Sequence, residues 1–377
     1  ATRAKHRPRY TYRLADCRIN DKQQHEMSYD DPHIINDGIT ILDALDALNK
    51  LSGEVMTLLA VDAEGRMTGT LTDGDIRRCL LQGSGLLDKV RSVMHRNFRY
   101  LHSGESNVAE LRRCRQLGIS LLPVLDDNGC IQRIIDLTRC RSVLPVSAIL
   151  MAGGRGERLR PLTLTTPKPL LKIGSRPIID YNVESLAAHG ITDITVTTNY
   201  LAEMIHEHFS EPRYGVNVKC LRETAPLGTL GAVSLVERDD NGVTLVMNSD
   251  LLTTISYEDM YLKHIEDKAD ITVASVPYMV SVPYAILMTD GSHVNSIEEK
   301  PTYTYQANAG IYLINNRLLN TLKPGERIDT PELIERAIAD GRRVSFFPIS
   351  GLWMDIGSPS DFKQAQELMR HHHDLTH

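Results

Sequence analysis

One stretch decides the fold of this chain: Val146-Ser-Ala-Ile-Leu-Met-Ala-Gly-Gly-Arg-Gly-Glu-Arg-Leu-Arg-Pro-Leu-Thr163, followed by Pro167-Lys168-Pro169. It begins with an apolar run over residues 148–152, which is typical of a strand buried on both faces. The run ends in Gly153-Gly154-Arg155-Gly156, where glycines permit positive φ and let several amide N–H groups converge on phosphate oxygens. Arg158 and Lys168 add two positive charges. The stretch therefore predicts a nucleoside triphosphate site at the end of a buried strand.

The spacing of these glycines differs from that of two common phosphate-binding loops. The dinucleotide fingerprint G-x-G-x-x-G is absent here, and no Gly-Lys-Ser/Thr follows, as a Walker A loop would require. A Gly-x-Gly alone would also suit a charged surface loop. The whole string resembles the signature of the sugar-1-phosphate nucleotidyltransferases (NDP-sugar pyrophosphorylases), with these residues in place: Gly153, Gly154, Gly156, Arg158, Leu159, Pro161, Lys168 and Pro169.

This resemblance implies roles for the residues of the stretch. Nucleotide contacts are expected from Leu150, Ala152, Gly153, Gly154 and Gly156. Arg158 and Lys168 are expected to be catalytic, because they would neutralise charge on the leaving pyrophosphate.

Helix and strand patterns alternate from residue 146 onward, which predicts right-handed crossovers and a Rossmann-like, mostly parallel sheet with helices on both faces. We assign residues 146–370 to a nucleotidyltransferase domain and 371–377 to a solvated tail. Strands are expected at 148–152, 194–198, 216–221, 243–247, 271–276, 310–314 and 344–348, and helices at 177–189, 201–209, 229–237 and 257–267.

Two acidic residues lie at predicted strand ends. Asp250 follows Asn248 and Ser249, and Asp355 belongs to Trp353-Met-Asp-Ile-Gly357. Either aspartate alone would suit a helix cap or a turn. Together with the nearby cations they suit a hard divalent ion shared with phosphate oxygens, and the resemblance implies Mg²⁺ on Asp250 and Asp355. Ser249 replaces the glycine usual in the family, and we expect it to narrow the space beside the sugar.

Two later segments resemble the sugar side of the family's site. Glu298-Glu-Lys-Pro301 implies that Lys300 holds the phosphate of the sugar phosphate and Glu299 a sugar hydroxyl. Asn308-Ala-Gly-Ile-Tyr312 resembles the strand that closes the sugar pocket, so Asn308 and Gly310 are expected there. Ala285 stands where the family usually has glycine, which leaves the identity of the sugar open.

The expected reaction is an in-line attack of a sugar 1-phosphate on the α-phosphorus of a nucleoside triphosphate, with pyrophosphate as leaving group. Glu223 and Gly228 occupy the segment from which the family binds the base. A carboxylate offers only acceptors, which suits the two adjacent donors of guanine and favours GTP. A uridylyl-, cytidylyl- or thymidylyltransferase of the same fold is the alternative, as is a non-catalytic nucleotide sensor.

The composition is that of an ordinary globular protein. Its 377 residues are 42% hydrophobic and 24% charged, with net charge −6, which argues against nucleic-acid binding. No apolar run approaches the roughly 18 residues of a membrane span, and no secretory signal is visible. The six cysteines form no C-x-x-C pair and lie within apolar or helical patterns, so we expect reduced, structural thiols. We expect a cytoplasmic homo-oligomer that binds neither nucleic acid nor membrane.

Two further regions precede the signature. Residues 1–26 are basic and lack apolar periodicity, which predicts a disordered extension. Residues 33–142 contain two copies of one pattern, 33–92 and 93–142, that resemble a tandem CBS (Bateman) pair. That resemblance implies adenine- or guanine-nucleotide binding at Thr72 and Asp75, whereas the second copy has Asp136 and Arg139 at the matching places. A packing or dimerisation module with an empty cleft is the alternative.

Overall fold

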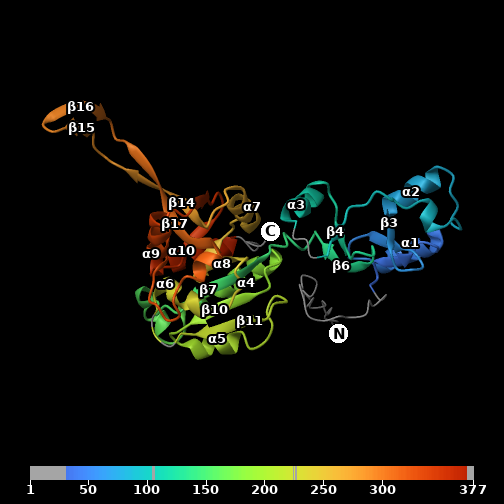
Figure 1. The fold of residues 1–377 in the computed structure, drawn as a ribbon, viewed down its shortest axis with the longest axis horizontal. Coiled ribbons are helices and arrows are strands. Elements are labelled where there is room, and N and C mark those ends of the chain that lie inside the picture. Colours follow the sequence, from blue (N-terminus) through green and yellow to red (C-terminus); the bar gives the residue numbers. More distant parts are fainter. Residues whose placement is uncertain (1–30, 104–106, 224, 226, 372–377) are drawn as a thin grey trace, which may run out of the picture. The chain divides into compact units, whose positions relative to one another are not determined.

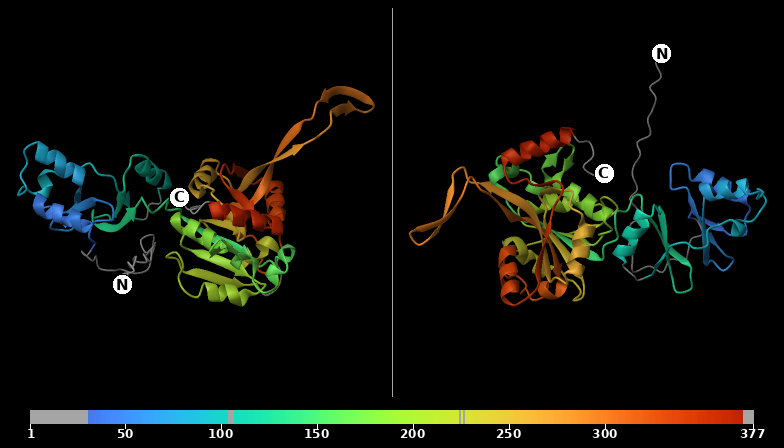
Figure 2. Two further views of the ribbon diagram at one scale, coloured as in Figure 1. Left: turned by 180° about the vertical axis from the view of Figure 1, so that it is seen from behind. Right: turned by 90° about the horizontal axis from the view of Figure 1, so that it is seen from above.

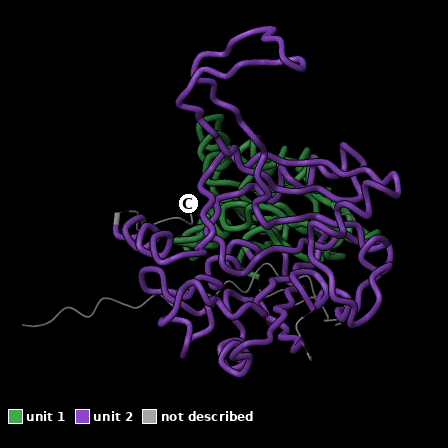
Figure 3. Tube along the Cα trace, turned by 90° about the vertical axis from the view of Figure 1, so that its left-hand side faces the viewer, with its two compact units in different colours: residues 1–144, 188–190 green, residues 145–187, 191–377 purple. Residues whose placement is uncertain are grey.

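The chain forms two compact units in a computed structural model that describes residues 31–103, 107–223, 225 and 227–371 (Figure 1). One unit comprises residues 1–144 with 188–190, and the other comprises residues 145–187 with 191–377 (Figure 3). The predicted disordered extension and nearly all of the predicted tail lie outside the described residues.

The first unit repeats one arrangement of elements. Its first copy contains β1 (Ile34–Asn36), α1 (Ile41–Lys50), β2 (Thr57–Val61), β3 (Met67–Thr72) and α2 (Asp73–Leu81). The second contains β4 (Leu101–His102), α3 (Val108–Gln116), β5 (Leu121–Leu125) and β6 (Ile131–Asp136). In both copies the central strand pairs in parallel with the first strand and antiparallel with the last. The two copies therefore share the order strand-helix-strand-strand and its pairing, whereas α2 has no counterpart after β6 in the residues that the structure describes.

The copies also share a hydrophobic core. Each copy has its own cluster of buried apolar side chains around its helices. A further cluster joins strands of both copies, with Leu59, Val61 and Met67 from the first and Leu125 and Ile131 from the second. The two copies thus bury their sheets against one another.

Capping boxes explain where α1 and α2 begin. Thr72 Oγ1 accepts a hydrogen bond of 3.2 Å from the Asp75 amide, and the Thr72 amide donates one of 2.8 Å to Asp75 Oδ2. Thr40 and Asp43 form the same box at α1. Such pairs satisfy amide groups that the first helical turn leaves free.

A seven-stranded sheet forms the centre of the second unit, in the order β11-β10-β7-β12-β17-β14-β18 (Figure 1). β17 runs antiparallel to both of its neighbours, and every other neighbouring pair is parallel. The predicted mostly parallel sheet is therefore confirmed. Its strands are β7 (Val146–Ala152), β10 (Ile194–Thr198), β11 (Val218–Arg222), β12 (Val243–Asn248), β14 (Ile271–Ser281), β17 (Thr302–Asn315) and β18 (Val344–Pro348).

The helices of this unit are α4 (Ile178–Ala188), α5 (Ala202–His208), α6 (Gly228–Gly231), α7 (Tyr257–Glu266), α8 (Asn316–Leu319), α9 (Thr330–Ala339) and α10 (Pro359–His371). The single helix predicted over 229–237 is wrong: α6 spans one turn and continues as the 3-10 segment η6 (Ala232–Leu235). Gly228 has φ +80°, and a Cβ at Gly231 would lie 2.4 Å from the Glu326 carbonyl oxygen. Glycine there permits close packing but weakens the helix.

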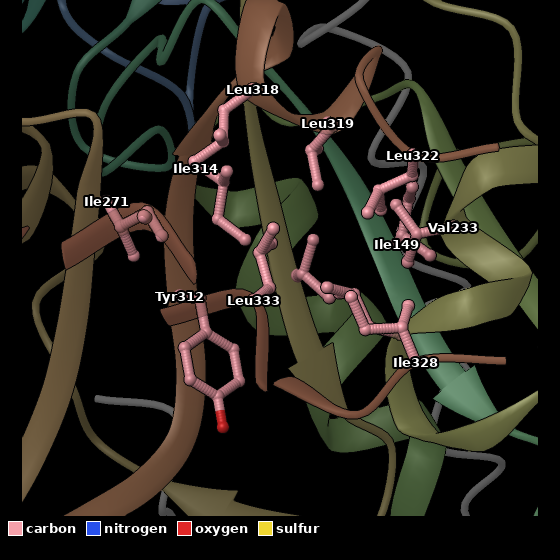
Figure 4. Packing of buried hydrophobic residues seen from close by; sticks show 13 residues of the cluster. Ile149, Val233, Ile271, Tyr312, Ile314, Leu318, Leu319, Leu322, Ile328 and Leu333 are labelled. Atoms are coloured by element: carbon pink, nitrogen blue, oxygen red, sulfur yellow. The ribbon is translucent and has the colours of Figure 1, made fainter. Parts of the chain in front are cut away.

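One face of the sheet packs against α8 and α9. Ile149, Ile271 and Ile314 from three strands meet Leu319 of α8 and Leu333 of α9 in a fully buried cluster (Figure 4). Burial of this aliphatic cluster holds the sheet rigid behind the strand ends that carry the polar residues.

A hairpin arm extends the second unit. β14 and β17 continue well past the predicted 271–276 and 310–314, and β15 (Ile286–Asp290) pairs with β16 (His293–Glu298) beyond them. Two differently oriented views show β15 and β16 projecting away from the seven-stranded sheet (Figures 1 and 2).

Candidate functional site

Two aspartates meet because a small strand pair joins distant segments. β13 (Leu251–Thr253), directly after Asp250, pairs antiparallel with β19 (Trp353–Asp355), and Leu251 lies opposite Asp355. The Ile356 amide also donates to the Asp250 carbonyl oxygen over 3.1 Å. This pairing holds Asp250 and Asp355 side by side at the carboxyl end of β12.

Lys168 binds both carboxylates. Its ammonium group donates a hydrogen bond to Asp250 Oδ2 and lies 3.6 Å from Asp355 Oδ1. The Lys168 side chain is 12% exposed, that of Asp250 19% and that of Asp355 39%. Because both acids contact one Nζ atom, they are close enough to share a cation.

Each carboxylate keeps one oxygen without a hydrogen bond. Asp250 Oδ1 and Asp355 Oδ1 are buried and accept no hydrogen bond from the described residues, although the Lys168 ammonium group lies 3.6 Å from Asp355 Oδ1. Burial and the charge of Asp250 raise the pKa of Asp355, against the opposing effects of Lys168 and Arg158. Buried acceptors without donors are costly unless a cation binds them. No group of three or more His, Cys, Asp or Glu suited to a metal forms among the described residues.

Arg158 adds a second cation at the same place. A Cβ at Gly357 would lie 3.2 Å from Arg158 Nη2 and 3.4 Å from Asp355 Oδ2, so the guanidinium and the carboxylate flank this glycine. Leu159, next in sequence, is buried with Ile356 in the cluster beneath the site. The signature thus anchors its leucine in the core and presents its arginine beside the acids.

The glycine loop is held by close contacts. Gly156 has φ +60°, and a Cβ there would lie 3.0 Å from Thr163 Cγ2 and 3.1 Å from Lys168 Cβ. Thr163 Oγ1 donates to the Gly156 carbonyl oxygen over 2.8 Å. Tyr200 Oη in turn donates to the Thr163 carbonyl oxygen over 3.0 Å. Sequence reasoning gave no role to Thr163, a buried polar residue inside the signature.

Glu223 lies against the start of this loop. A Cβ at Gly153 would come within 2.6 Å of Glu223 Oε1, so a larger residue there would displace the Glu223 carboxylate. Glu223 is 8% exposed, and burial raises its pKa while a backbone hydrogen bond from Leu227 opposes that shift. A Cβ at Gly154, by contrast, would meet no atom within 4 Å. Glu223 is therefore a buried acceptor beside open space at the loop.

The remaining residues expected to bind nucleotide differ in exposure. Leu150 and Ala152 are buried in β7, so only their backbone or Cβ atoms could reach a ligand. Gly228 packs against the backbone of Ile328: a Cβ at Gly228 would lie 2.7 Å from the Ile328 carbonyl oxygen. Its role in this structure is close packing of the α6 segment.

Two residues predicted on the sugar side, Asn308 and Gly310, lie next to the segments that carry the two aspartates. Gly310 has φ +73°, and a Cβ there would lie 2.6 Å from Asn248 Nδ2. Asn308 Oδ1 accepts from the Gly310 amide over 2.9 Å. Trp353 Nε1, two residues before Asp355, donates to the Ala309 carbonyl oxygen over 2.9 Å. The strand with Asn308 and Gly310 is therefore fastened to both aspartate segments.

Glu299 and Lys300 are not brought to this place. Both are exposed on the hairpin arm, in the turn between β16 and β17. Along an extended strand of about 3.3 Å per residue, Lys300 lies roughly 25 Å from Asn308.

Ser249 does not narrow the site as expected. It is 2% exposed, and its hydroxyl donates to the Met151 carbonyl oxygen over 2.7 Å. The side chain is used to join β12 to β7. Asn182 Nδ2 supports the same segment by donating to the Ser249 carbonyl oxygen over 3.2 Å, a role for which the sequence carried no local signal.

Comparison with known proteins identifies relatives of the second unit. A family model described as Nucleotidyl transferase matches residues 147–372. Mannose-1-phosphate guanyltransferase from Saccharomyces cerevisiae is 34% identical over 237 residues, covering 59% of this chain and 64% of that protein. The enzyme of the same name from Schizosaccharomyces pombe is 34% identical over 232 residues, covering 58% and 62%. The chain thus matches less than two thirds of the length of these relatives.

Among solved structures, HddC from Yersinia pseudotuberculosis aligns with 24% identity and a TM-score of 0.47, over 59% of this chain and 99% of that one. Within the described part of the chain, none of the helices has the length and apolar character needed to span a bilayer.

Proposed function

We propose, on the basis that this chain belongs to the nucleotidyl transferase family, that it joins a sugar 1-phosphate to GTP and releases pyrophosphate. The observation that carries the proposal is the convergence of Asp250, Asp355 and Lys168 beside the glycine loop. A guanylyl rather than another nucleotidyl group is favoured by the relatives named mannose-1-phosphate guanyltransferase.

The two aspartates fit a magnesium ion. Asp250 Oδ1 and Asp355 Oδ1 are buried hard acceptors without a hydrogen bond, and magnesium is commonly held by one or two carboxylates together with substrate phosphates. When bound, Mg²⁺ would supply positive charge to phosphate oxygens during the transfer. The Lys168 ammonium group offsets the negative charge of both aspartates when no magnesium ion is bound.

The protein groups would act by position and charge. A phosphate oxygen of the sugar 1-phosphate forms the new bond to the α-phosphorus, and the bond from that phosphorus to the bridging oxygen breaks with its electron pair leaving on pyrophosphate. Arg158 and the loop amides would offset charge on the leaving group, with Lys168 beside them. No enzyme nucleophile is required, because both reactants are held in line.

Glu223 supports GTP as the substrate. Its carboxylate is buried beside Gly153, where a base entering over the open Gly154 would meet it. Guanine presents a ring N–H and an amino group side by side, and a carboxylate can accept from both. Uracil and thymine present one donor between two acceptors and would meet repulsion from the same carboxylate.

We extend the proposal to residues 33–142, which we assign as a CBS pair on the basis of the shared order, pairing and joint core of its two copies. A nucleotide with adenine or guanine as its base would bind the first copy at Thr72 and Asp75. In the second copy Arg139 lies 3.4 Å from Asp136, so the equivalent positions pair with each other.

Release of pyrophosphate from each nucleoside triphosphate, with and without Mg²⁺, tests the enzyme proposal. Mannose, glucosamine, glucose and heptose 1-phosphates should be offered in turn. We expect magnesium-dependent release with GTP and one of these sugars. Equal rates with GTP and UTP would contradict the base assignment, and no release with any pair would favour a nucleotide sensor.

A further inference from the structure

The middle of the signature, residues 160–166, has little apolar anchoring. Thr163 is the one buried residue of this stretch, at 1% exposure. Leu162 and Leu164 on either side of it are 44% and 54% exposed. The arginine and the lysine that lie near the two aspartates precede and follow this stretch. Polar contacts rather than packing must therefore hold the backbone between the two cations.

Thr163 connects this stretch to the glycine loop. Its hydroxyl donates to the Gly156 carbonyl oxygen over 2.8 Å. Gly156 directly precedes the 3-10 turn η3 (Glu157–Leu159), which contains Arg158. A Cβ at Gly156 would also lie only 3.1 Å from Lys168 Cβ. A shift of Thr163 would therefore move backbone that adjoins both cations.

Tyr200 holds Thr163 from a different segment of the chain. Its hydroxyl donates to the Thr163 carbonyl oxygen over 3.0 Å and to the Leu164 carbonyl oxygen over 3.3 Å. These two carbonyl groups end the 3-10 turn η4 (Leu162–Leu164). The last carbonyl groups of a helical turn have no donor within it, so an outside donor stabilises the turn. The Tyr200 hydroxyl is such a donor.

The backbone of Tyr200 is fixed by the strand ends next to the proposed base. Thr198 of β10 pairs with Ala152 of β7, directly before Gly153. The Glu223 amide donates to the Thr198 carbonyl oxygen over 2.8 Å. Tyr200 therefore begins on the base-binding side of the loop and reaches the side that carries the cations.

The turn that carries Tyr200 has an unusual backbone. Leu201 has φ +50°, an uncommon conformation for a residue with a branched side chain. α5 begins at the next residue, Ala202. Strained backbone persists only where the surrounding structure fixes it, and it is concentrated at functional sites. The strain at Leu201 thus agrees with a fixed place for Tyr200.

We propose that Tyr200 is a positioning residue: its hydroxyl holds the cations assigned to the leaving pyrophosphate at a fixed place relative to the base-binding carboxylate. These groups are Arg158, Lys168 and Glu223. The inference rests on the proposed function, because it concerns the phosphates of GTP. Tyr200 acts through Thr163 and not by contact with substrate. Charges that are already in place when the reaction begins stabilise the transition state most.

The proposal separates the two ends of GTP. Gly153 and Glu223 directly follow β7 and β11, so their place does not depend on the Tyr200 hydroxyl. Contacts to the base and to the α-phosphate should therefore survive its loss. Contacts to the β- and γ-phosphates should weaken, because residues 160–166 contain no other buried side chain.

Tyr200→Phe removes only the hydroxyl and tests this separation. We expect kcat/KM for GTP, measured by release of pyrophosphate, to fall about tenfold, near the upper end of what one hydrogen bond contributes. In calorimetry with Mg²⁺, the Kd of GTP should rise and the Kd of GMP should stay within about twofold of the wild type. Equal changes for GTP and GMP, or no change for either, would overturn the proposal.

Tyr181→Phe is the matched control. The Tyr181 hydroxyl donates to the Ile173 carbonyl oxygen over 2.7 Å in the same compact unit, so this variant also loses one bond from a phenol to the backbone. Both variants should lower Tm, but only Tyr200→Phe should separate GTP from GMP. The same separation in Tyr181→Phe would mean that it follows from lost stability, and the positioning role would fall.

A double variant tests the route through Thr163. Thr163→Val keeps the shape of the side chain without its hydroxyl, and Thr163→Ser keeps the hydroxyl. Combined with Tyr200→Phe, Thr163→Val should reduce kcat/KM by less than the product of the two single effects, because both act on one chain of hydrogen bonds. Thr163→Ser should stay near the wild type. Independent, multiplicative effects would contradict this route.

The outcomes distinguish this inference from the proposed function. A wild-type chain that releases no pyrophosphate would refute the proposed function. The affinities for GTP and GMP are measured without a sugar phosphate, so they test Tyr200 whether or not turnover is observed. Normal wild-type turnover with unchanged kcat/KM in Tyr200→Phe would overturn the positioning role and leave the proposed function in place.

Discussion

At the scale of single residues, Lys168 has the most direct effect on charge at the site, because it contacts both aspartates. We predict that Lys168→Ala lowers turnover at least ~100-fold, the scale seen when one preorganised charge is removed. Lys172→Ala is the control, since that side chain is exposed in the next short strand. Steady-state pyrophosphate release measures both, and similar turnover in the two variants would contradict the assignment.

Glu223 determines which base we expect. Glu223→Gln keeps the size of the side chain but replaces one acceptor with a donor. Losing a charge-assisted pair of hydrogen bonds costs about 1.5–3 kcal/mol, so kcat/KM for GTP should fall roughly 10- to 100-fold. For UTP, kcat/KM should fall less than it does for GTP, or rise. Competition between the two nucleotides measures the ratio, and an unchanged preference would exclude Glu223 from base recognition.

Asp355 illustrates a conflict between stability and function. Its pKa is raised in the folded state, mainly by burial and by Asp250. A raised carboxyl pKa stabilises the fold at low pH, and that contribution is lost as the pH rises through the folded value. Asp355→Asn in metal-free buffer should therefore have a higher Tm than wild type at pH 7, with a smaller difference near pH 4.

Added Mg²⁺ provides the matching control for this variant. A ligand that binds only the folded state raises Tm. Magnesium should therefore stabilise the wild type more than Asp355→Asn, as measured by thermal unfolding. A variant less stable than wild type at pH 7 without metal would show that the carboxylate is stabilising there.

At the scale of elements, the two capping boxes of the first unit offer a matched pair. Thr40 and Thr72 cap α1 and α2 in the same way, so either substitution by alanine should cost about 1 kcal/mol of stability. Only Thr72 belongs to the motif that we assign to a ribose. Thr72→Ala should therefore abolish nucleotide binding in calorimetry, and Thr40→Ala should not. Equal retention in both variants would favour a packing module.

Sequence patterns predicted the buried elements well. The apolar run over 194–198 gave the bounds of β10 directly, and the spacing over 257–267 predicted α7 to within one residue, because burial imposes those patterns locally. The pairing of β13 with β19 joins residues about a hundred positions apart and has no local signature. Only the family resemblance placed Asp250 and Asp355 together before the structure did.

The arm could not be predicted for a related physical reason. The alternation in β14 and β17 is the same inside the sheet and beyond it, so the sequence does not mark where the sheet ends and the arm begins. For residues 229–237 the error was the opposite one, because the sequence predicted a longer helix than the structure contains. Its helical spacing is real, but glycines that allow close packing with Glu326 interrupt the helix.

At the scale of the whole molecule, the residues assigned to the two nucleotides belong to different compact units. Thr72 and Asp75 belong to the first unit, whereas the glycine loop, Glu223 and the two aspartates belong to the second. A nucleotide bound at the first unit changes turnover only if it binds two states of the chain with different affinity. We therefore predict that Thr72→Ala keeps the wild-type KM for GTP and loses any change in turnover that added adenine or guanine nucleotides produce, as measured by steady-state pyrophosphate release.

A matched variant separates this effect from damage to the fold. Thr40→Ala removes the equivalent cap of α1 and should keep the response of turnover to the added nucleotide, because Thr40 is outside the motif assigned to the ribose. Equal responses in Thr40→Ala and Thr72→Ala would exclude Thr72 from nucleotide binding and would favour a packing module.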